Sequence, residues 1–166
     1  MNQDFYCFNL EVKMPKSFSP EELDNMTHDK LVLYTGTEKS SIMFAQSIGL
    51  LPKVKICVCG SDTSLRFRVG ERENCTSFRC VDRSCRKEVS IRKNTIFEKS
   101  HLKISIILRM MHKFVCDEVN FENIAQNFVI GSNHTIVDWL NLFRDVCLGH
   151  FLRNPILIGG PVHIVD

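Results

Sequence analysis

No stretch of the sequence is apolar for long enough to cross a bilayer. Runs such as SIILRMM at residues 105–111 are interrupted by serine, arginine or lysine, whereas a transmembrane helix needs about 20 predominantly apolar residues in succession. The opening MNQDFYCFNLEVKM has neither the basic start nor the apolar centre of a secretory signal. We therefore expect no membrane partner and an intracellular location, which would be nuclear in a eukaryotic cell.

Disulfide bonds are not expected in a reducing compartment, although the chain has eight cysteines. Five of them fall between residues 57 and 85. Clustered cysteines in such a compartment bind metal more often than they pair with one another. Cys116 and Cys147 lie far from the cluster, in segments with helical periodicity, so we expect them to be buried apolar side chains.

Negative charge is scarce in the middle of the chain. Residues 53–113 hold 15 Lys or Arg against 6 Asp or Glu, a balance of +9, whereas residues 1–52 come to −3 and residues 114–166 to −4. A basic block between acidic ones is typical of proteins that bind a polyanion, with nucleic acid the leading candidate. On charge alone, a solvated surface without a partner is an equally good interpretation.

The periodicity of apolar residues predicts an α+β protein. Residues 1–52 form a helical N-terminal extension, with a capping box at Ser19 and Glu22 and a further helix start at Thr37. Residues 53–99 contain the short β-prone pieces KVKICV, LRFRV, TSFRCV and EVSIRK, separated by turn residues, which indicates a thin antiparallel sheet. Residues 100–153 return to a helical period.

Three helices are expected between residues 100 and 153. HLKISIILRMMHKFV has a wide apolar stripe, NFENIAQNF is short, and a third helix follows a turn at Gly131 with a cap at Ser132 or Asn133. This order is that of a helix-turn-helix unit, whose last helix enters the major groove. The candidate base-contacting residues are Ser132, Asn133, His134 and Thr135.

The third helix leaves an alternative open. It is acidic rather than basic, so a three-helix packing element without DNA contact fits the pattern equally well. Its apolar side is expected to consist of Ile136, Trp139, Leu140, Phe143 and Val146.

Four cysteines in the β-prone part are spaced like zinc ligands. Cys57 and Cys59 form one close pair, and Cys80 and Cys85 form another, which strands could bring together at tetrahedral corners. Metal affinity would then stabilise a sheet too thin to hold itself together. We expect a structural zinc ribbon without an open catalytic position. Because the first pair is C-x-C, Cys75 is an alternative to Cys57 or Cys80, and redox chemistry or plain burial remain other interpretations.

Five stretches occur in an order and at gaps that match a known family: GLLP, a cysteine pair followed by glycine, RC and a further cysteine running into RKEVSIRKNTIFEKSHL, TIVDWLNLFRDVC, and IGGPVHIV. Through them the chain resembles the Merlin-type DDE transposases and related bacterial insertion-sequence transposases over residues 41–165. The resemblance implies a zinc ribbon and a helical DNA-binding region ahead of a ribonuclease-H-like core that cuts and joins DNA.

The resemblance also assigns individual positions. It makes Cys57, Cys59, Cys80 and Cys85 the zinc ligands, and it places Asn94 where the family usually has glycine; asparagine tolerates positive φ better than most residues. The first catalytic Asp of the family would come two positions beyond Asp166. Residues 154–166 would therefore be the truncated start of the catalytic core. Even if Asp166 served as the catalytic Asp, one carboxylate could not hold two metal ions, so we expect no transposase activity.

The leading expectation is a non-enzymatic, DNA-binding fragment that recognises transposon-end DNA. The phosphate contacts are expected from Arg79, Arg83, Arg86, Lys87, Arg92 and Lys93. Two alternatives stay open: a zinc-stabilised module that binds other proteins, and a truncated relic without function. A homo-oligomer is compatible with the leading expectation.

Overall fold

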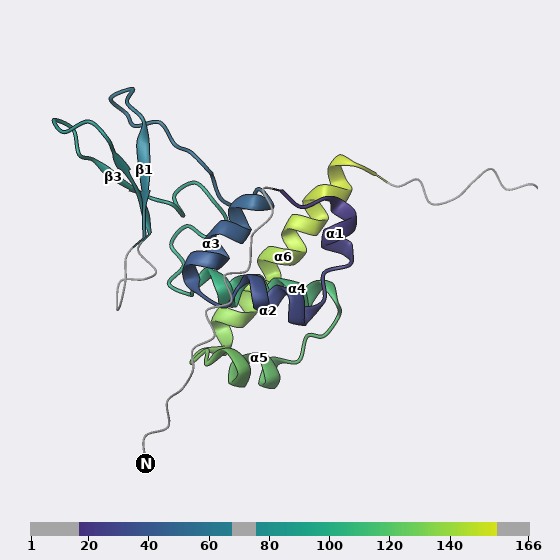
Figure 1. The fold of residues 1–166 in the computed structure, drawn as a ribbon. Helices are drawn as coiled ribbons and strands as arrows, with labels where there is room; N and C mark the ends of the chain where they lie inside the picture. The colour runs from purple at the N-terminus through teal and green to yellow at the C-terminus, as the bar shows by residue number, and fades with distance from the viewer. Residues whose placement is uncertain (1–16, 68–75, 156–166) are drawn as a thin grey trace, which may run out of the picture. The chain divides into compact units, whose positions relative to one another are not determined.

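The protein is described here by a computed structural model that covers residues 17–67 and 76–155. The described residues form an α+β fold with six helices and a three-stranded antiparallel sheet (Figure 1). This confirms the predicted fold class as α+β with a small antiparallel sheet. The elements are α1 (Pro20–Asp24), α2 (His28–Tyr34), α3 (Glu38–Ser47), β1 (Thr63–Arg66), β2 (Ser77–Cys80), β3 (Glu88–Ser90), α4 (Ile104–Val115), α5 (Phe121–Phe128) and α6 (Asn133–Arg153).

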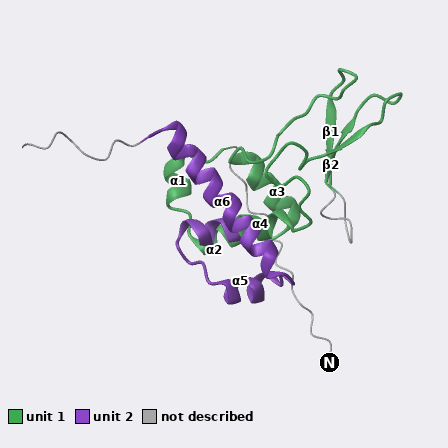
Figure 2. Ribbon diagram, turned by 180° about the vertical axis from the view of Figure 1, so that it is seen from behind, with its two compact units in different colours: residues 1–109 green, residues 110–166 purple. Residues whose placement is uncertain are grey.

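The chain divides into two compact units at residues 1–109 and 110–166, with the boundary inside α4 (Figure 2). The first unit contains α1 to α3, the sheet and the start of α4; the second contains the rest of α4, α5 and α6. The division predicted from the sequence has its boundaries elsewhere, at residues 53, 100 and 154, and stays a prediction.

Side-chain caps begin α1 and α3 at the residues that the sequence predicts, Ser19 and Thr37. Ser19 Oγ accepts from the Glu22 amide at 3.2 Å, and the Glu22 carboxylate accepts from the Ser19 amide at 2.8 Å. Thr37 Oγ1 accepts from the Ser40 amide at 3.0 Å at the start of α3. These bonds satisfy amides that lack a partner within the helix, which is why each helix begins at that residue.

The sheet has one apolar face. The strands lie in the order β1-β2-β3, and the register places Leu65 opposite Phe78 and Phe78 opposite Val89. Because successive side chains of a strand point to opposite faces, these three lie in one row across the sheet. Phe78, at the centre of the row, is 2% exposed. One face of the sheet therefore contributes to the core.

Two of the predicted β-prone pieces are only partly extended. KVKICV contributes a single bridge, between Ile56 and Asp62. EVSIRK forms β3 and then enters a series of turns at Ile91. Within these turns Asn94 has φ 62°, a left-handed conformation that glycine and asparagine tolerate best. Asn94 thus occupies a backbone conformation suited to glycine.

A buried ion pair joins these turns to α3. Arg92 Nη2 lies 3.3 Å from Glu38 Oε1, and the two residues are 6% and 4% exposed. Arg92 Nη1 also donates to the carbonyl oxygens of Ser100 at 3.0 Å and Leu102 at 2.7 Å. A buried charge is tolerated when several hydrogen bonds offset its desolvation, and the guanidinium of Arg92 has such partners.

Glu38 serves a second purpose at the start of α4. Its Oε1 accepts from the Ile104 amide at 2.9 Å, and its Oε2 accepts from the Ser105 amide at 3.4 Å. The first amides of a helix lack partners within it and carry partial positive charge, so a carboxylate there is stabilising. One carboxylate from α3 therefore holds both the start of α4 and the turns after β3.

Arg109 makes a further link within the first unit. Its Nε donates to Thr35 Oγ1 at 2.9 Å, and its Nη2 donates to the Thr35 carbonyl at 2.7 Å. Thr35 is fully buried at the end of α2. The carbonyl at a helix end has no partner within the helix, and the arginine supplies one.

The core of the second unit lies on one side of α6. Ile136, Trp139, Leu140 and Phe143 are buried as predicted, whereas Val146 is 52% exposed, so the prediction for Val146 is wrong. The reason is length: α5 has 8 residues and α6 has 21, which correspond to about 12 Å and about 32 Å. The short helix α5 cannot cover the whole of α6.

The connection between α5 and α6 runs from Val129 to Ser132 and includes Gly131, where the sequence predicts a turn. The residue with positive φ in this connection is Val129, at 51°. Val129 is 90% exposed, so its side chain meets no packing obstacle in this conformation. Among the described residues, no helix is both long and apolar enough to cross a membrane.

Replacing Glu38 with alanine should strongly destabilise the first unit. The substitution leaves the Arg92 guanidinium buried without its carboxylate and frees the first amides of α4, and breaking a buried pair in this way costs about 3–5 kcal/mol. Denaturant unfolding followed by circular dichroism measures the change. The control Glu21→Ala, at an exposed carboxylate of α1, should cost less than about 1 kcal/mol. Equal costs for the two variants would contradict the assignment.

Candidate metal centre

Four sulfur atoms converge at one end of the sheet. Cys57 and Cys59 lie before β1, Cys80 ends β2, and Cys85 lies between β2 and β3. All four Sγ atoms are within 4.8 Å of one another, with 3.7 Å between Cys57 and Cys85 and 3.5 Å between Cys59 and Cys80. Four thiolates bound tetrahedrally at about 2.3 Å from one ion would be about 3.8 Å apart. The cluster therefore has the size that a single metal ion requires.

The first cysteine pair is held by a tight turn. The Cys57 amide donates to the Ser61 carbonyl at 2.9 Å, and the Gly60 amide donates to the Cys57 carbonyl at 2.9 Å. Gly60 has φ 86°, a backbone conformation that residues other than glycine rarely adopt. The glycine after the pair is thus needed for the backbone to reverse and bring both sulfur atoms to the same side.

The second pair is held by the loop between β2 and β3. Asp82 Oδ1 accepts from the Ser84 amide at 2.8 Å and from Ser84 Oγ at 2.7 Å, and these bonds lower the pKa of Asp82. The Cys85 amide donates to the Asp82 carbonyl at 3.3 Å, and the Cys80 amide to the Lys87 carbonyl at 2.9 Å. The loop is therefore shaped by its own hydrogen bonds to present both sulfur atoms.

The thiols of the cluster differ in acidity. Hydrogen bonds from Ser61 lower the pKa of Cys59 to about 6. Burial raises the pKa of Cys80 to about 12, because the surrounding residues exclude the water that would solvate a thiolate. Four thiolates so close together would repel one another strongly without a cation. A bound divalent ion reverses this balance and keeps coordinating thiols deprotonated.

Comparisons of the chain with models of protein families, with curated proteins and with solved structures found no match. The resemblance to Merlin-type transposases therefore stays a prediction. The assignment of a metal site rests on the geometry of the four sulfur atoms.

The structure brings together all four cysteines predicted as metal ligands. Cys75, the alternative ligand, lies outside the described residues. Cys116 and Cys147 are both exposed, so the prediction that they are buried is wrong. Cys116 comes directly after the last residue of α4, and Cys147 lies within α6 with its side chain open to solvent.

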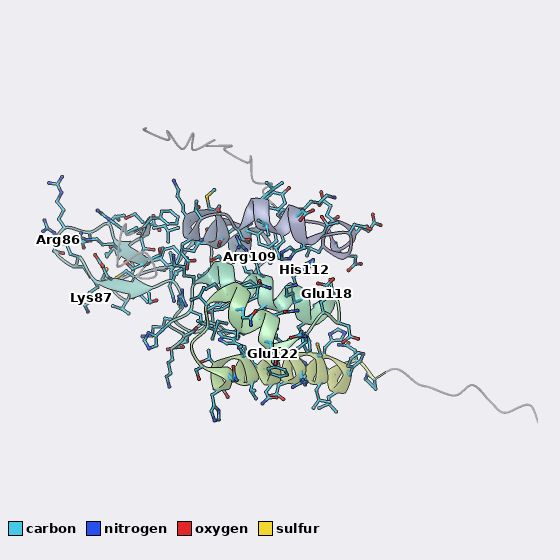
Figure 3. All side chains as sticks on the ribbon, turned by 90° about the horizontal axis from the view of Figure 1, so that it is seen from below. Arg86, Lys87, Arg109, His112, Glu118 and Glu122 are labelled. Atoms are coloured by element: carbon cyan, nitrogen blue, oxygen red, sulfur yellow. The ribbon has the colours of Figure 1, made fainter. Side chains whose placement is uncertain are left out.

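The residues predicted to contact phosphate are divided by the structure. Arg83, Arg86, Lys87 and Lys93 are exposed, and Figure 3 shows Arg86 and Lys87 at the end of the sheet with side chains directed outward. Arg79, on β2, lies 3.7 Å from a carboxylate oxygen of Glu88.

Arg92 is different, because it is buried in its ion pair with Glu38. It cannot reach a phosphate in this conformation, and the prediction for it is corrected: Arg92 has a structural role. Its partner Glu38 lies 54 residues away in the sequence, and nothing in the local basic run distinguishes Arg92 from its exposed neighbours.

The residues predicted to contact bases lie at the start of α6. Ser132, Asn133 and His134 are exposed, and Thr135 is half-buried. Ser132 occupies the N-cap position without a side-chain capping bond, so its hydroxyl is not engaged by the helix.

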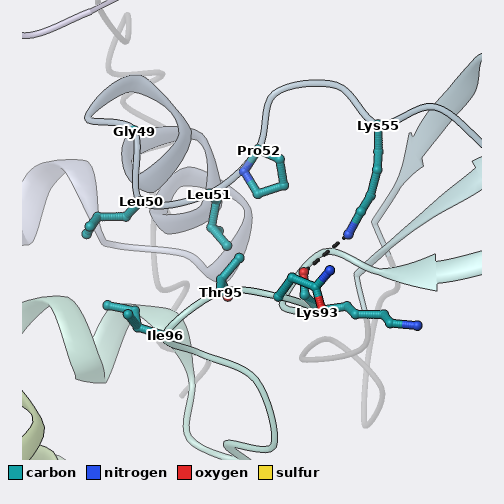
Figure 4. Close-up of a pocket in the computed structure, with 9 residues that line it drawn as sticks. Gly49, Leu50, Leu51, Pro52, Lys55, Lys93, Thr95 and Ile96 are labelled. Atoms are coloured by element: carbon teal, nitrogen blue, oxygen red, sulfur yellow. Dashed lines mark hydrogen bonds between the residues drawn. The ribbon is translucent and has the colours of Figure 1, made fainter.

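A concavity of about 840 Å³ lies in the first unit, apart from the cysteine cluster (Figure 4). One wall is the GLLP segment after α3, and the other consists of the turns around Asn94. Lys55 Nζ donates to the Lys93 carbonyl at 3.2 Å and closes one side. Two of the stretches that carry the family resemblance therefore meet at one place. Among the described residues that line it there is no cysteine, histidine or carboxylate.

Removing the metal should unfold the sheet but not the helices. Cys80→Ser, Cys85→Ser or a strong chelator should abolish protection of backbone amides in residues 53–97, because metal affinity supplies folding free energy that the sheet lacks. Hydrogen exchange with mass spectrometry localises the loss, and circular dichroism should retain most of the helical signal of residues 100–150. Cys147→Ser, an exposed cysteine outside the cluster, is the matched control. Full protection in metal-free protein would rule out the structural role.

Proposed function

We propose that the chain binds DNA through a zinc-stabilised ribbon made of the sheet and its four cysteines. The observation that carries the proposal is that the metal-sized thiol cluster and the exposed basic residues share one loop: Arg83 lies between Cys80 and Cys85, and Arg86 follows directly. Zinc is the proposed ion because four thiolates in a closed tetrahedral set are the ligands typical of structural zinc.

We propose α5 and α6 as a second DNA-contacting element of the helix-turn-helix type. A short connection joins them, and α6 begins with the exposed residues Ser132, Asn133 and His134. The first turn of α6 has no acidic residue, and the start of a helix favours phosphate. Asn133 and His134 can hydrogen-bond base edges, which would supply sequence preference.

The resemblance to Merlin-type transposases supports transposon-end DNA as the target. The proposed role of the described residues is binding and not catalysis. Arginine and lysine contacts to phosphate would give most of the affinity, and the start of α6 would give the preference for particular ends.

A protein partner is the second candidate, and the end of α6 is what favours it. Leu148, Phe151 and Leu152 are 56%, 53% and 72% exposed. Exposed apolar residues grouped on one helix end are typical of interaction surfaces. Such a partner would leave binding insensitive to salt, which separates the two candidates.

DNA binding should weaken steeply as salt rises. Each phosphate contact contributes about 0.9 to the slope of log affinity against log salt concentration. Electrophoretic mobility shift at several salt concentrations measures this slope. The probes are duplexes that carry the ends of the transposon from which the chain is proposed to derive, called element ends below, and shuffled duplexes of equal length.

The two proposed elements should respond differently to substitution. Asn133→Ala should reduce the preference for the element ends by about 1–3 kcal/mol, whereas Arg83→Ala should weaken binding to both duplexes alike. A complex whose affinity does not depend on salt, or no complex at all, would overturn the proposed function.

A further inference from the structure

The face of the sheet opposite the apolar row is polar. The register places Ser64 opposite Arg79 and Arg79 opposite Glu88, so these three side chains lie in line. Arg66 follows Ser64 by two positions along β1 and is therefore on the same face. Arg66 and Arg79 are diagonal neighbours, a relation that puts side chains about 7–8 Å apart. Two strands thus present arginines to the same side.

A groove of about 450 Å³ lies on this face, next to the metal centre. Four arginines line it: Arg66 from β1, Arg79 from β2, and Arg83 and Arg86 from the loop between β2 and β3. Of the lining residues that the structure describes, only Asp82 is acidic. Strands and loop therefore converge to concentrate positive charge in a single concavity.

Most of this positive charge is not neutralised. Arg79 is paired with Glu88 at 3.7 Å, but in the part of the chain that the structure describes no ion pair involves Arg66, Arg83 or Arg86. All three are exposed. Such a surface attracts an anion, and its field is strongest where the concavity excludes water.

The metal centre positions two of the four arginines. Cys80 lines the groove, and its loop returns to the cluster at Cys85. Arg86 has φ 47°, and its amide donates to the Asp82 carbonyl at 3.0 Å. An ion bound at the cluster would therefore hold the segment of Arg83 at both ends, at Cys80 and Cys85, and would fix the residue directly before Arg86.

The chemistry of the lining identifies the ligand class. The planar guanidinium of arginine donates two parallel hydrogen bonds to a phosphate, and several arginines in a row suit a chain of phosphates. Among the described residues that line the groove, none is an asparagine or glutamine that could contact base edges, and none is an aromatic residue that could stack on unpaired bases. The lining is suited to a backbone whose bases are already paired.

We propose that this groove binds the phosphodiester backbone of duplex DNA without regard to sequence, and that Arg66 is one of its contacts. This inference rests on the proposed function, because it names the surface through which the ribbon meets DNA. Arg66 is not among the contacts predicted from the sequence, although it lies in LRFRV, one of the β-prone pieces. The ribbon then supplies affinity and not specificity.

The test is fluorescence anisotropy of a short labelled duplex, titrated with zinc-loaded protein at several salt concentrations. Arg66→Gln and Arg83→Gln should each lower the salt slope by about 0.9. A variant that matches the unsubstituted protein at 1 M salt should therefore bind the duplex about eightfold more weakly than that protein at 0.1 M salt. The loss should be equal for element-end and shuffled duplexes. Lys30→Gln, which removes an exposed charge from α2, should leave slope and affinity unchanged.

The outcomes separate this inference from the proposed function. If the unsubstituted protein binds DNA and both groove variants keep its affinity and slope, the groove assignment is overturned while DNA binding stands. If the unsubstituted protein shows no salt-dependent binding, both fall. Tighter binding of single-stranded DNA or of RNA than of duplex DNA also overturns the assignment. Zinc content and circular dichroism of each variant establish that a loss of affinity is not a loss of fold.

Discussion

A sheet whose strands are three or four residues long buries too little apolar surface to remain folded unaided. Phe78 is buried on one face, but the other face is polar and open to solvent. The four thiols at the end of the sheet answer this deficit, because an ion bound among them would join the segment before β1 to the loop after β2. Metal binding and folding of the sheet then form one equilibrium, and the direction of the basic side chains depends on it.

A buried ion pair, and not a metal, holds the sheet at the end of β3 that lies away from the cysteines. β3 is preceded by Cys85 and followed by Arg92, so the strand is anchored at both sides by different chemistry. Glu38 extends this anchor to the start of α4. One acidic side chain thus links α3, the turns after β3 and the start of α4, and it adds polar contacts to the apolar core of the first unit.

Local spacing was sufficient to predict the features that depend on local structure. The capping box at Ser19 and the two cysteine pairs follow from residues at most five positions apart. Arg92 could not be assigned in this way, because its burial depends on Glu38, which is 54 residues distant. Val146 and Cys147 fit an amphipathic period, but their exposure depends on how short α5 is. Arg66 required the register of β1 against β2, which periodicity does not supply.

The shared role of Glu38 has a consequence for how the sequence can change over time. A neutral residue at position 38 would leave the guanidinium of Arg92 buried without its partner, and a neutral residue at position 92 would leave the carboxylate of Glu38 buried without its partner. Neither position is therefore free to vary alone, and divergence at one requires a compensating replacement at the other. In an alignment of related chains, positions 38 and 92 would covary, joining a helix of the acidic N-terminal segment to the basic centre of the chain.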